Sequence, residues 1–271
     1  MTSVIIGPFS LPIGYIMLML AFGIAILVGS LVGRRTRSSV ISKLGDIFLV
    51  TVVAARLGFI IRYFEFYRDD WLGMLDIRDG GFDPWFGLAG TVLMALFWYW
   101  RHADVRKPLA IAVSTGVIAW LGIWSGVQMM GYPNVDVPDL ELVDLEGQPQ
   151  NLAVVGAGEP RVVNLWASWC GPCVREMPML EAAQQEYPNV TFIFVNQAES
   201  PTRGLEFLGE QGLNLRHNLF DLRAELPELI QSRGLPTTLF YDASGTLQDT
   251  HAGELSRATL AQGLAKILPE D

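Results

Sequence analysis

The segment V-N-L-W-A-S-W-C-G-P-C, residues 163–173, joins an apolar run to two closely spaced cysteines. Residues Arg161–Ser168 are rich in Val and Leu, which predicts a buried strand. A helix is predicted from Cys173 to Tyr187, so Cys170 is expected at the amino end of that helix. Two intervening residues let both sulfurs meet in disulfide geometry, in which the Cα atoms lie about 4.4–6.8 Å apart. The pattern indicates a strand, a turn and a helix built around a dithiol.

A cysteine at the start of a helix is suited to redox chemistry. Unpaired backbone N–H groups and the positive end of the helix dipole stabilise a thiolate there, and the thiol pKa can fall from about 8.5 to about 7. The thiolate of Cys170 can attack a disulfide, and Cys173 can then resolve the mixed disulfide. The alternative is half of a zinc site, which needs two further ligands, whereas His102, His217 and His251 are scattered. We expect a redox site without metal or cofactor.

The residues after the dithiol alternate between strand and helix patterns, which predicts an α/β domain over 161–271 with helices on both faces of a sheet. A tether and a short N-terminal extension, 134–160, precede it and include an extended stretch at Leu140–Leu145. The predicted order is β–α–β–α–β–β–α, with a further helical stretch before the last two strands. After the first strand and helix, the predicted elements are Val190–Val195, Thr202–Gln211, Glu225–Ser232, Thr237–Tyr241, Thr246–His251 and Arg257–Leu268.

Composition divides the 271 residues into two halves. Residues 1–133 hold 11 Lys and Arg against 8 Asp and Glu, whereas residues 134–271 hold 8 against 20, and together they give the net charge of −9. The acidic C-terminal half argues against binding to nucleic acid. The chain has only two cysteines, so a structural disulfide framework is excluded.

The N-terminal half predicts an all-α membrane domain, 1–133. A helix needs roughly 20 residues to cross a hydrocarbon core of about 30 Å, and four apolar stretches meet or approach that length: 11–33, 44–64, 82–100 and 108–130. The first lacks a basic leader and an A-x-A cleavage site, so we expect a retained helix. Trp71 and the run Trp98-Tyr99-Trp100 stand where interfacial aromatic residues are expected.

Charges in the connecting loops predict the orientation of the membrane domain. The loops after the first and third spans are basic, whereas the loop after the second and the segment after the fourth are acidic on balance. We therefore expect a multi-pass protein of the bacterial inner membrane with both termini outside. The C-terminal domain would face the periplasm.

Arg56 lies near the middle of the second predicted span, where a charge is costly. It could contact a lipid headgroup or another anionic ligand. Alternatively, it could be satisfied internally by backbone carbonyls, by water or by an acid such as Glu65 or Asp83. We expect internal satisfaction.

Several motifs in order resemble the TlpA/ResA branch of thioredoxin-like proteins. The quoted segment is followed by Arg175-Glu176-Met177-Pro178, by Val195-Asn196-Gln197-Ala198-Glu199-Ser200 and by Gly234-Leu235-Pro236-Thr237-Thr238. The resemblance covers about 137–268 and implies a thioredoxin fold. It implies catalytic roles for Cys170, Cys173, Glu176 and a cis Pro236. It implies substrate contacts for Trp169, Gly171, Pro172, Leu235 and Thr237.

Within this resemblance, Glu176 would tune or relay the proton of the buried cysteine. The alternative is a solvated acid of the first helical turn, favoured by the helix dipole. Thioredoxin itself has an Asp in the strand, where this chain has Asn164. Pro178 is expected to kink the helix without ending it, and Glu199 is expected to be a loop acid.

One part of the membrane half, about 52–101, resembles the prolipoprotein diacylglyceryl transferases. Ala55-Arg56-Leu57-Gly58-Phe59 is similar to that family's G-x-R-x-G-Y run, and Asp79-Gly80-Gly81-Phe82 with Gly87-Leu88-Ala89-Gly90 is similar to a second motif. Trp85 stands where the family has an important histidine, and a later signature is missing. The resemblance indicates ancestry and argues against transferase chemistry.

We therefore expect a membrane-anchored, extracytoplasmic thiol–disulfide oxidoreductase. Gly171-Pro172 is the dipeptide of reducing thioredoxins, so we expect a reductant. Its partners would be disulfide-bearing extracytoplasmic proteins, with apocytochrome c as the family's best-known class, the lipid bilayer and a membrane electron donor of the DsbD/CcdA type. The rival hypotheses are a lipid-modifying transferase and a non-catalytic adaptor.

Overall fold

The computed structural model describes residues 3–6, 9–36, 40–68, 70–130, 136–232 and 234–268. Two compact units divide the chain: Ile13–Gly131, and Tyr132–Asp271 together with Met1–Pro12. The predicted boundary at 133/134 lies outside the described residues. The second of these units contains both cysteines.

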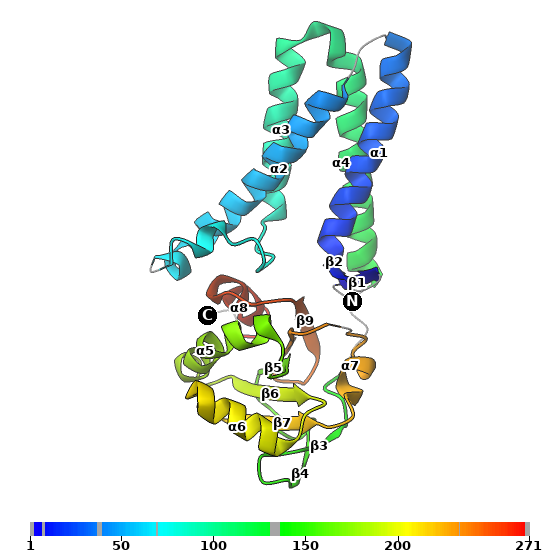
Figure 1. Cartoon of the computed structure of the whole chain (residues 1–271). Coiled ribbons are helices and arrows are strands. Elements are labelled where there is room, and N and C mark those ends of the chain that lie inside the picture. The colour runs from blue at the N-terminus through cyan, green and yellow to red at the C-terminus, as the bar shows by residue number, and fades with distance from the viewer. Residues whose placement is uncertain are drawn as a thin grey trace. The chain divides into compact units, whose positions relative to one another are not determined.

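The first unit is helical, as predicted. It consists of α1 (Ile13–Thr36), α2 (Ile41–Arg62), α3 (Pro84–Arg101) and α4 (Arg106–Met130), with short 3₁₀ turns η1 (Phe64–Tyr67), η2 (Gly73–Leu75) and η3 (Ala103–Val105). A hairpin of β1 (Ser3–Ile6) and β2 (Phe9–Pro12) precedes α1, so the first helix begins two residues later than the predicted span. Figure 1 shows α2 beside α3 and α1 beside α4.

Small residues allow the two helix pairs to pack closely. The Cβ of Ala54 on α2 would lie only 2.6 Å from a Cβ added to Gly90 of α3, and Thr51 and Thr91 share a hydrogen bond of 2.6 Å between the same helices. Close approach through small residues and polar cross-links is the usual packing of helices in lipid.

Three stretches among the described helices are long and apolar enough to cross a membrane: Ile16–Gly33, Ile41–Arg62 and Ala103–Val127. The third predicted span is a helix, α3, but it does not belong to this group. Its 18 residues include Pro84, four aromatic residues with polar atoms and Arg101, which lower its mean hydropathy. The fold class is therefore a helical N-terminal region with three candidate spans.

The second unit is built on a mixed seven-stranded sheet in the order β4-β3-β7-β6-β5-β8-β9. In chain order its elements are β3 (Glu141–Val143), β4 (Pro149–Asn151), β5 (Arg161–Trp166), α5 (Gly171–Glu186), β6 (Thr191–Gln197), α6 (Pro201–Gln211), β7 (His217–Asp221), α7 (Glu225–Leu229), β8 (Thr237–Tyr241), β9 (Leu247–Ala252) and α8 (Arg257–Leu264). Strands β5, β6 and β7 are parallel, and β8 runs antiparallel to β5.

Alternation along the central strands builds a core on each face of the sheet. On one face Val162, Trp166 and Phe194 pack with residues of α5, α6 and α8. On the other face Val163, Leu165 and Val195 pack with Leu226 of α7 and with residues of the extension around Leu152. Burial on both faces explains why β5 and β6 read as nearly continuous apolar runs.

The sequence prediction missed β7 and misplaced several ends. The strand His217-Asn218-Leu219-Phe220-Asp221 is short and polar at both ends, and only its pairing with β6 and β3 fixes it as a strand. Helices α7 and α8 end three and four residues before the predicted ends, at Leu229 and Leu264. Strand β8 lies where it was predicted, and β3 lies within the predicted extended stretch at Leu140–Leu145.

Candidate functional site

Cys170 and Cys173 form a disulfide at the carboxyl end of β5, with their Cα atoms 5.3 Å apart. Cys170 is the N-cap of α5, and its Sγ accepts the backbone N–H of Cys173 at 3.3 Å. The side chain of Cys173 is fully buried, whereas Cys170 retains a little exposure. A sulfur at a helix N-cap receives both a hydrogen bond and the positive end of the dipole, so the geometry favours a thiolate on Cys170.

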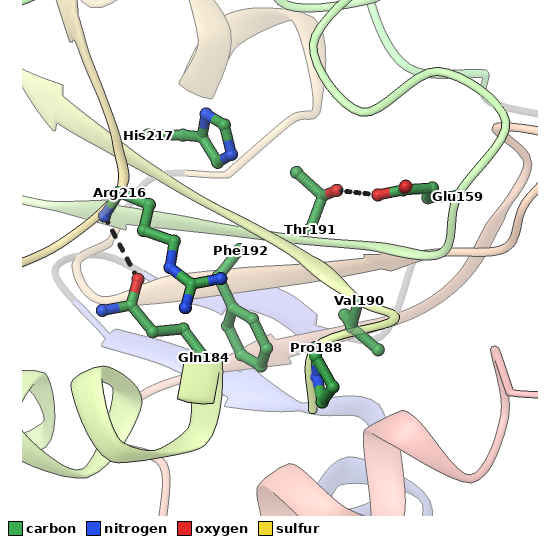
Figure 2. Close-up of a pocket in the computed structure, with 8 residues that line it drawn as sticks. All are labelled: Glu159, Gln184, Pro188, Val190, Thr191, Phe192, Arg216 and His217. Atoms are coloured by element: carbon green, nitrogen blue, oxygen red, sulfur yellow. Dashed lines mark hydrogen bonds between the residues drawn. The ribbon is translucent and has the colours of Figure 1, made fainter. Parts of the chain in front are cut away.

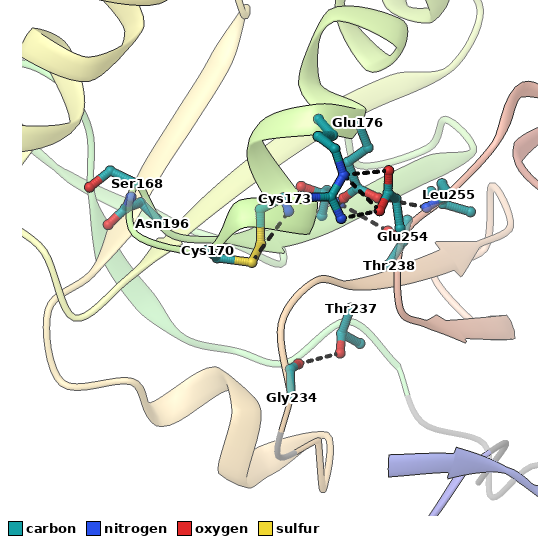
Figure 3. The surroundings of a disulfide bond; sticks show 12 residues. Ser168, Cys170, Cys173, Glu176, Asn196, Gly234, Thr237, Thr238, Glu254 and Leu255 are labelled. Atoms are coloured by element: carbon teal, nitrogen blue, oxygen red, sulfur yellow. Dashed lines mark hydrogen bonds and ion pairs between the residues drawn. A yellow bond between two sulfur atoms is a disulfide. The ribbon is translucent and has the colours of Figure 1, made fainter. Parts of the chain in front are cut away.

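The loop before β8 lies at the same edge of the sheet. The Leu235–Pro236 peptide bond is cis, as predicted. Because Leu165 pairs with Thr237, Pro236 enters the sheet beside the end of β5, the strand that leads to Cys170. Figure 3 shows the loop from Gly234 to Thr237 facing the disulfide. The topology thus brings together the two motifs that are most distant in the sequence.

Glu176 lies one helical turn beyond Cys173 and is almost completely buried, with an exposure of 2%. Its Oε1 accepts a hydrogen bond from Nδ2 of Asn164 at 2.8 Å, and its Oε2 accepts one from the backbone N–H of Leu255 at 2.7 Å. Burial raises the pKa of Glu176 to about 8, although both hydrogen bonds act against the rise. The alternative of a solvated first-turn acid is therefore wrong.

The segment that holds Leu255 is itself fixed to α5 by an ion pair. Arg175 donates to both carboxylate oxygens of Glu254, with distances of 3.1 Å from Nε and 2.6 Å from Nη2. Figure 3 shows Glu254 of this pair near the buried Glu176. Arg175 and Glu176 thus bind consecutive residues of the same loop.

Glu199 has a larger structural role than the expected loop acid. Its carboxylate accepts hydrogen bonds from the backbone N–H of Ser168 at 2.8 Å, from the Ser168 hydroxyl at 2.5 Å and from Nδ2 of Asn196 at 2.7 Å. Donation by these groups holds the pKa of Glu199 below its usual value against the effect of burial. The β6–α6 loop thereby anchors the residues that lead into Cys170. No spacing pattern of Ser168 and Glu199 signals this contact in advance.

The residues predicted to contact substrate differ in how far they are exposed to solvent. Trp169 projects into solvent, with an exposure of 71%, next to Cys170. Gly171 is exposed, and Pro172 and Leu235 are half-buried. The side chain of Thr237 is buried instead, and its hydroxyl donates to the Gly234 carbonyl at 2.8 Å. Thr237 therefore supports the cis-proline loop from within.

Arg56, the candidate of the helical unit, is satisfied internally. It forms an ion pair with Asp79 at 2.9 Å and donates to the carbonyls of Gly73, Met74, Asp76 and Gly81. These five hydrogen bonds use all five guanidinium N–H donors. The partner acid, Asp79, is neither of the two that the sequence suggested, Glu65 and Asp83. Asp83 pairs instead with Arg62 at 2.8 Å. Arg56 has no donor left for a lipid headgroup.

A small cavity of about 130 Å³ lies elsewhere in the second unit, as Figure 2 shows. Its walls include Glu159, Gln184, Thr191, Arg216 and His217, at the beginnings of β6 and β7. The dithiol follows the carboxyl end of β5, which is parallel to these strands. The cavity is at their amino ends, so the cavity and the dithiol lie at opposite ends of the parallel strands. Among the residues that the structure describes, no group of three or more His, Cys, Asp and Glu could hold a metal ion.

Comparison with known proteins agrees with the geometry of the dithiol. The Redoxin family model matches residues 133–264. The chain is similar to Thioredoxin-like protein YneN of Bacillus subtilis, with 30% identity over 142 residues that cover 47% of this chain and 75% of the relative. It is also similar to Thiol:disulfide interchange protein DsbE of Vibrio cholerae, with 31% identity and coverage of 49% and 74%.

A third relative is Thiol-disulfide oxidoreductase ResA of Geobacillus thermodenitrificans, 29% identical over 134 residues that cover 49% of this chain and 76% of the relative. All three matches cover about half of this chain, a length that agrees with the family match to its C-terminal half. The cysteine pair at the helix terminus and the cis-proline loop lie within that half. The chain belongs, through its C-terminal half, to the Redoxin family, as a thioredoxin-fold thiol–disulfide oxidoreductase of the ResA/DsbE kind.

Proposed function

We propose that this protein is a membrane-anchored reductant of extracytoplasmic protein disulfides. The observation that supports it best is the Cys170–Cys173 pair at the N-terminus of α5, opposite the cis-proline loop. The helical unit would supply the anchor through its candidate spans. Basic loops after the first and third helices support an orientation with the dithiol outside the cytoplasm.

The proposed reaction begins with the reduced dithiol. The Cys170 thiolate attacks one sulfur of a client disulfide, a new S–S bond forms, and the second client sulfur leaves as a thiolate. Cys173 loses its proton and attacks Cys170, which breaks the mixed disulfide and releases the reduced client. Two electrons pass to the client, and the protein is left with the Cys170–Cys173 disulfide seen in the structure.

Glu176, in its ionised form, is placed to take the proton of Cys173. Residues three apart on a helix are neighbours, about 5–6 Å apart at Cβ, and the thiol is fully buried, so solvent does not reach it. With its pKa at about 8, the acid is poised to exchange a proton near neutral pH. Asn164 and Leu255 fix the carboxyl group in that position.

The reducing direction is supported by the dipeptide. Gly171-Pro172 offers no histidine to stabilise the thiolate further, and strongly oxidising dithiols have a very acidic nucleophile. Regeneration requires an outside dithiol, because the sequence has no cysteine in the helical unit. A membrane electron donor of the DsbD/CcdA type would serve, and apocytochrome c would be one class of client.

The rival functions have less support. A lipid-modifying transferase would need Arg56 or a neighbouring group free for a headgroup, and all five Arg56 donors are engaged by the chain itself. The resemblance of this region to diacylglyceryl transferases is a resemblance of sequence motifs alone. A non-catalytic adaptor would not need the buried acid beside the cysteine pair.

Reduction of insulin by dithiothreitol tests the proposed activity. A domain beginning at Asp136 contains the seven-stranded sheet and both cysteines, so we expect it to fold alone and to accelerate insulin precipitation. Cys170→Ser should remove the acceleration, whereas Glu186→Gln, at the exposed end of α5, should preserve it. A folded domain that leaves the rate unchanged would contradict the proposal.

A further inference from the structure

The loop between α2 and α3 turns back along α2 instead of extending beyond it. Arg56 lies six residues before the end of α2, which at 1.5 Å per residue is about 9 Å short of that end. Its guanidinium nevertheless reaches the carbonyls of Gly73, Met74 and Asp76. The backbone N–H of Asp83 donates to the Ala55 carbonyl at 2.9 Å, so α3 begins at the same level of α2.

The large apolar side chains of this loop are exposed instead of packing against α2. Leu72, Leu75 and Ile77 flank three of the four residues whose carbonyls bind Arg56, and they are exposed by 81%, 80% and 62%. Trp71 is exposed by 76%. Four large apolar side chains within seven residues form a surface that we call the apolar loop face, residues 71, 72, 75 and 77. Large apolar side chains exposed together in one short loop are typical of a site of contact with a partner or a membrane.

The charged side chains of residues 71–81 are paired with each other or with Arg56. The Arg78 guanidinium pairs with Asp76, and an oxygen of Asp70 accepts the backbone N–H of Gly73. Asp79 is buried against Arg56, and its second oxygen accepts the Tyr67 hydroxyl at 3.2 Å. The loop is therefore ordered by its own hydrogen bonds while its apolar side chains stay outside.

We infer that residues 71–81 form a re-entrant segment that lies in the lipid interface, with the apolar loop face against the boundary between headgroups and acyl chains and Arg56 as its internal clamp. Irregular backbone is tolerated at membrane depth only where its polar groups are satisfied by protein, and Arg56 satisfies four carbonyls of this segment. Interfacial apolar faces enter a bilayer by about 5–10 Å, which matches the depth of Arg56 below the end of α2. The occupant is lipid because the loop belongs to the connection between α2, a candidate span of 22 residues, and α3, and it packs back against α2 through Arg56.

This inference rests on the proposed membrane anchoring, and one experiment separates the two. The full chain has only two cysteines, so Cys170→Ser with Cys173→Ser gives a background for single labelled cysteines. An environment-sensitive fluorophore is placed at Leu72→Cys or Leu75→Cys in vesicles of phosphatidylcholine and phosphatidylglycerol. Leu49→Cys, on the exposed face of α2, reports insertion of that helix, and Glu146→Cys, in the exposed β3–β4 turn, reports water.

Two quenchers are compared: a lipid with a nitroxide near the carboxyl end of its acyl chain, and aqueous iodide. Labels at Leu72 and Leu75 should be quenched by the nitroxide lipid at least about threefold more than the label at Glu146, with weak quenching by iodide. Strong iodide quenching at both loop positions, with Leu49 still reached by lipid, would overturn the inference and leave the anchoring intact. Protection from both quenchers would mean that protein covers the loop, and it would overturn the inference too. Failure of the lipid quencher at Leu49 would overturn the anchoring and the inference together.

The clamp is tested by Arg56→Lys, which keeps the charge and loses the five-donor fork. The loop labels should then gain iodide quenching by about twofold or more, while Leu49 stays unchanged. If Arg56→Lys prevents insertion, Asp79→Asn replaces it, because it removes the buried ion pair and retains the size of the side chain. Unchanged quenching in the variant tested would contradict the role of Arg56.

Discussion

Replacing Glu176 by glutamine is expected to remove most of the loss of stability that the dithiol domain suffers as the pH rises from about 5 to 9. The folded-state pKa of Glu176 is about 8 against an ordinary value of 4.5, so the folded domain holds the proton more tightly than the unfolded chain. Stability contributed by this proton is complete below about pH 4.5 and is lost as the pH rises through about 8. At 1.36 kcal/mol for each tenfold change in proton affinity, the full loss is roughly 5 kcal/mol.

At low pH, the Glu176→Gln substitution itself lowers the free energy of unfolding. Both carboxyl oxygens accept N–H donors, from Asn164 and from Leu255. The amide of glutamine keeps one acceptor and turns its NH₂ group toward the other donor, which leaves a buried donor unsatisfied at a cost of roughly 1–3 kcal/mol. Glu176→Gln should therefore be less stable than the wild type by roughly 1–3 kcal/mol at pH 5 and more stable by roughly 2–4 kcal/mol at pH 9.

Urea unfolding of the oxidised domain at pH 5, 7 and 9 measures this crossing. Acids whose pKa is lowered, such as Glu199, Asp144 and Asp242, titrate below this range and contribute little to it. Glu186→Gln, at an exposed position of the same helix, serves as the matched control and should follow the wild type. If wild type and Glu176→Gln lost stability in parallel between pH 5 and 9, another group would be titrating and the assignment to Glu176 would be wrong.

Three further predictions concern the potential, the loop before the dithiol and the orientation. Equilibration of the domain with glutathione buffers should give a midpoint potential below about −220 mV, because the dipeptide is Gly171-Pro172, whereas a midpoint near −120 mV would make the protein an oxidant. Glu199→Ala leaves the donors of Ser168 and Asn196 without their acceptor and should destabilise the domain by roughly 1–3 kcal/mol, with raised hydrogen exchange at Ser168; unchanged exchange would contradict its anchoring role. A periplasmic reporter fused after Gly131 should be active and one fused after Arg37 inactive, and the opposite pattern would invert the proposed topology.

The sequence predicted the elements with strong local patterns. The strand and helix around the dithiol and the cis bond before Pro236 were all predictable, because apolar runs, helix-terminal residues and a distinctive motif mark them. Strand β7 was not, since its five residues carry too few apolar side chains to stand out and depend on β6 and β3. Likewise, α3 is a helix where one was predicted, but its mean hydropathy is too low for it to count among the candidate membrane spans.

The environment of individual side chains was harder to foresee than the motifs. Glu176 is one example: its role toward the buried cysteine was expected from the motif, but the burial that raises its pKa to about 8 depends on contacts with Asn164 and Leu255. The partners of Arg56 are another, because four are backbone carbonyls that only the turn of the loop brings near. Contacts of this kind depend on tertiary structure and have no fixed spacing in the sequence.

Trapping of a mixed disulfide tests the central assignment most directly. The domain with Cys173→Ser, mixed with a disulfide-bearing client peptide, should accumulate a covalent adduct through Cys170, which intact-mass measurement detects and dithiothreitol releases. The domain with Cys170→Ser should form none, because the remaining sulfur of Cys173 is fully buried. An adduct only with Cys170→Ser would reverse the roles of the two cysteines, and no adduct with either folded variant would contradict thiol–disulfide exchange at this site.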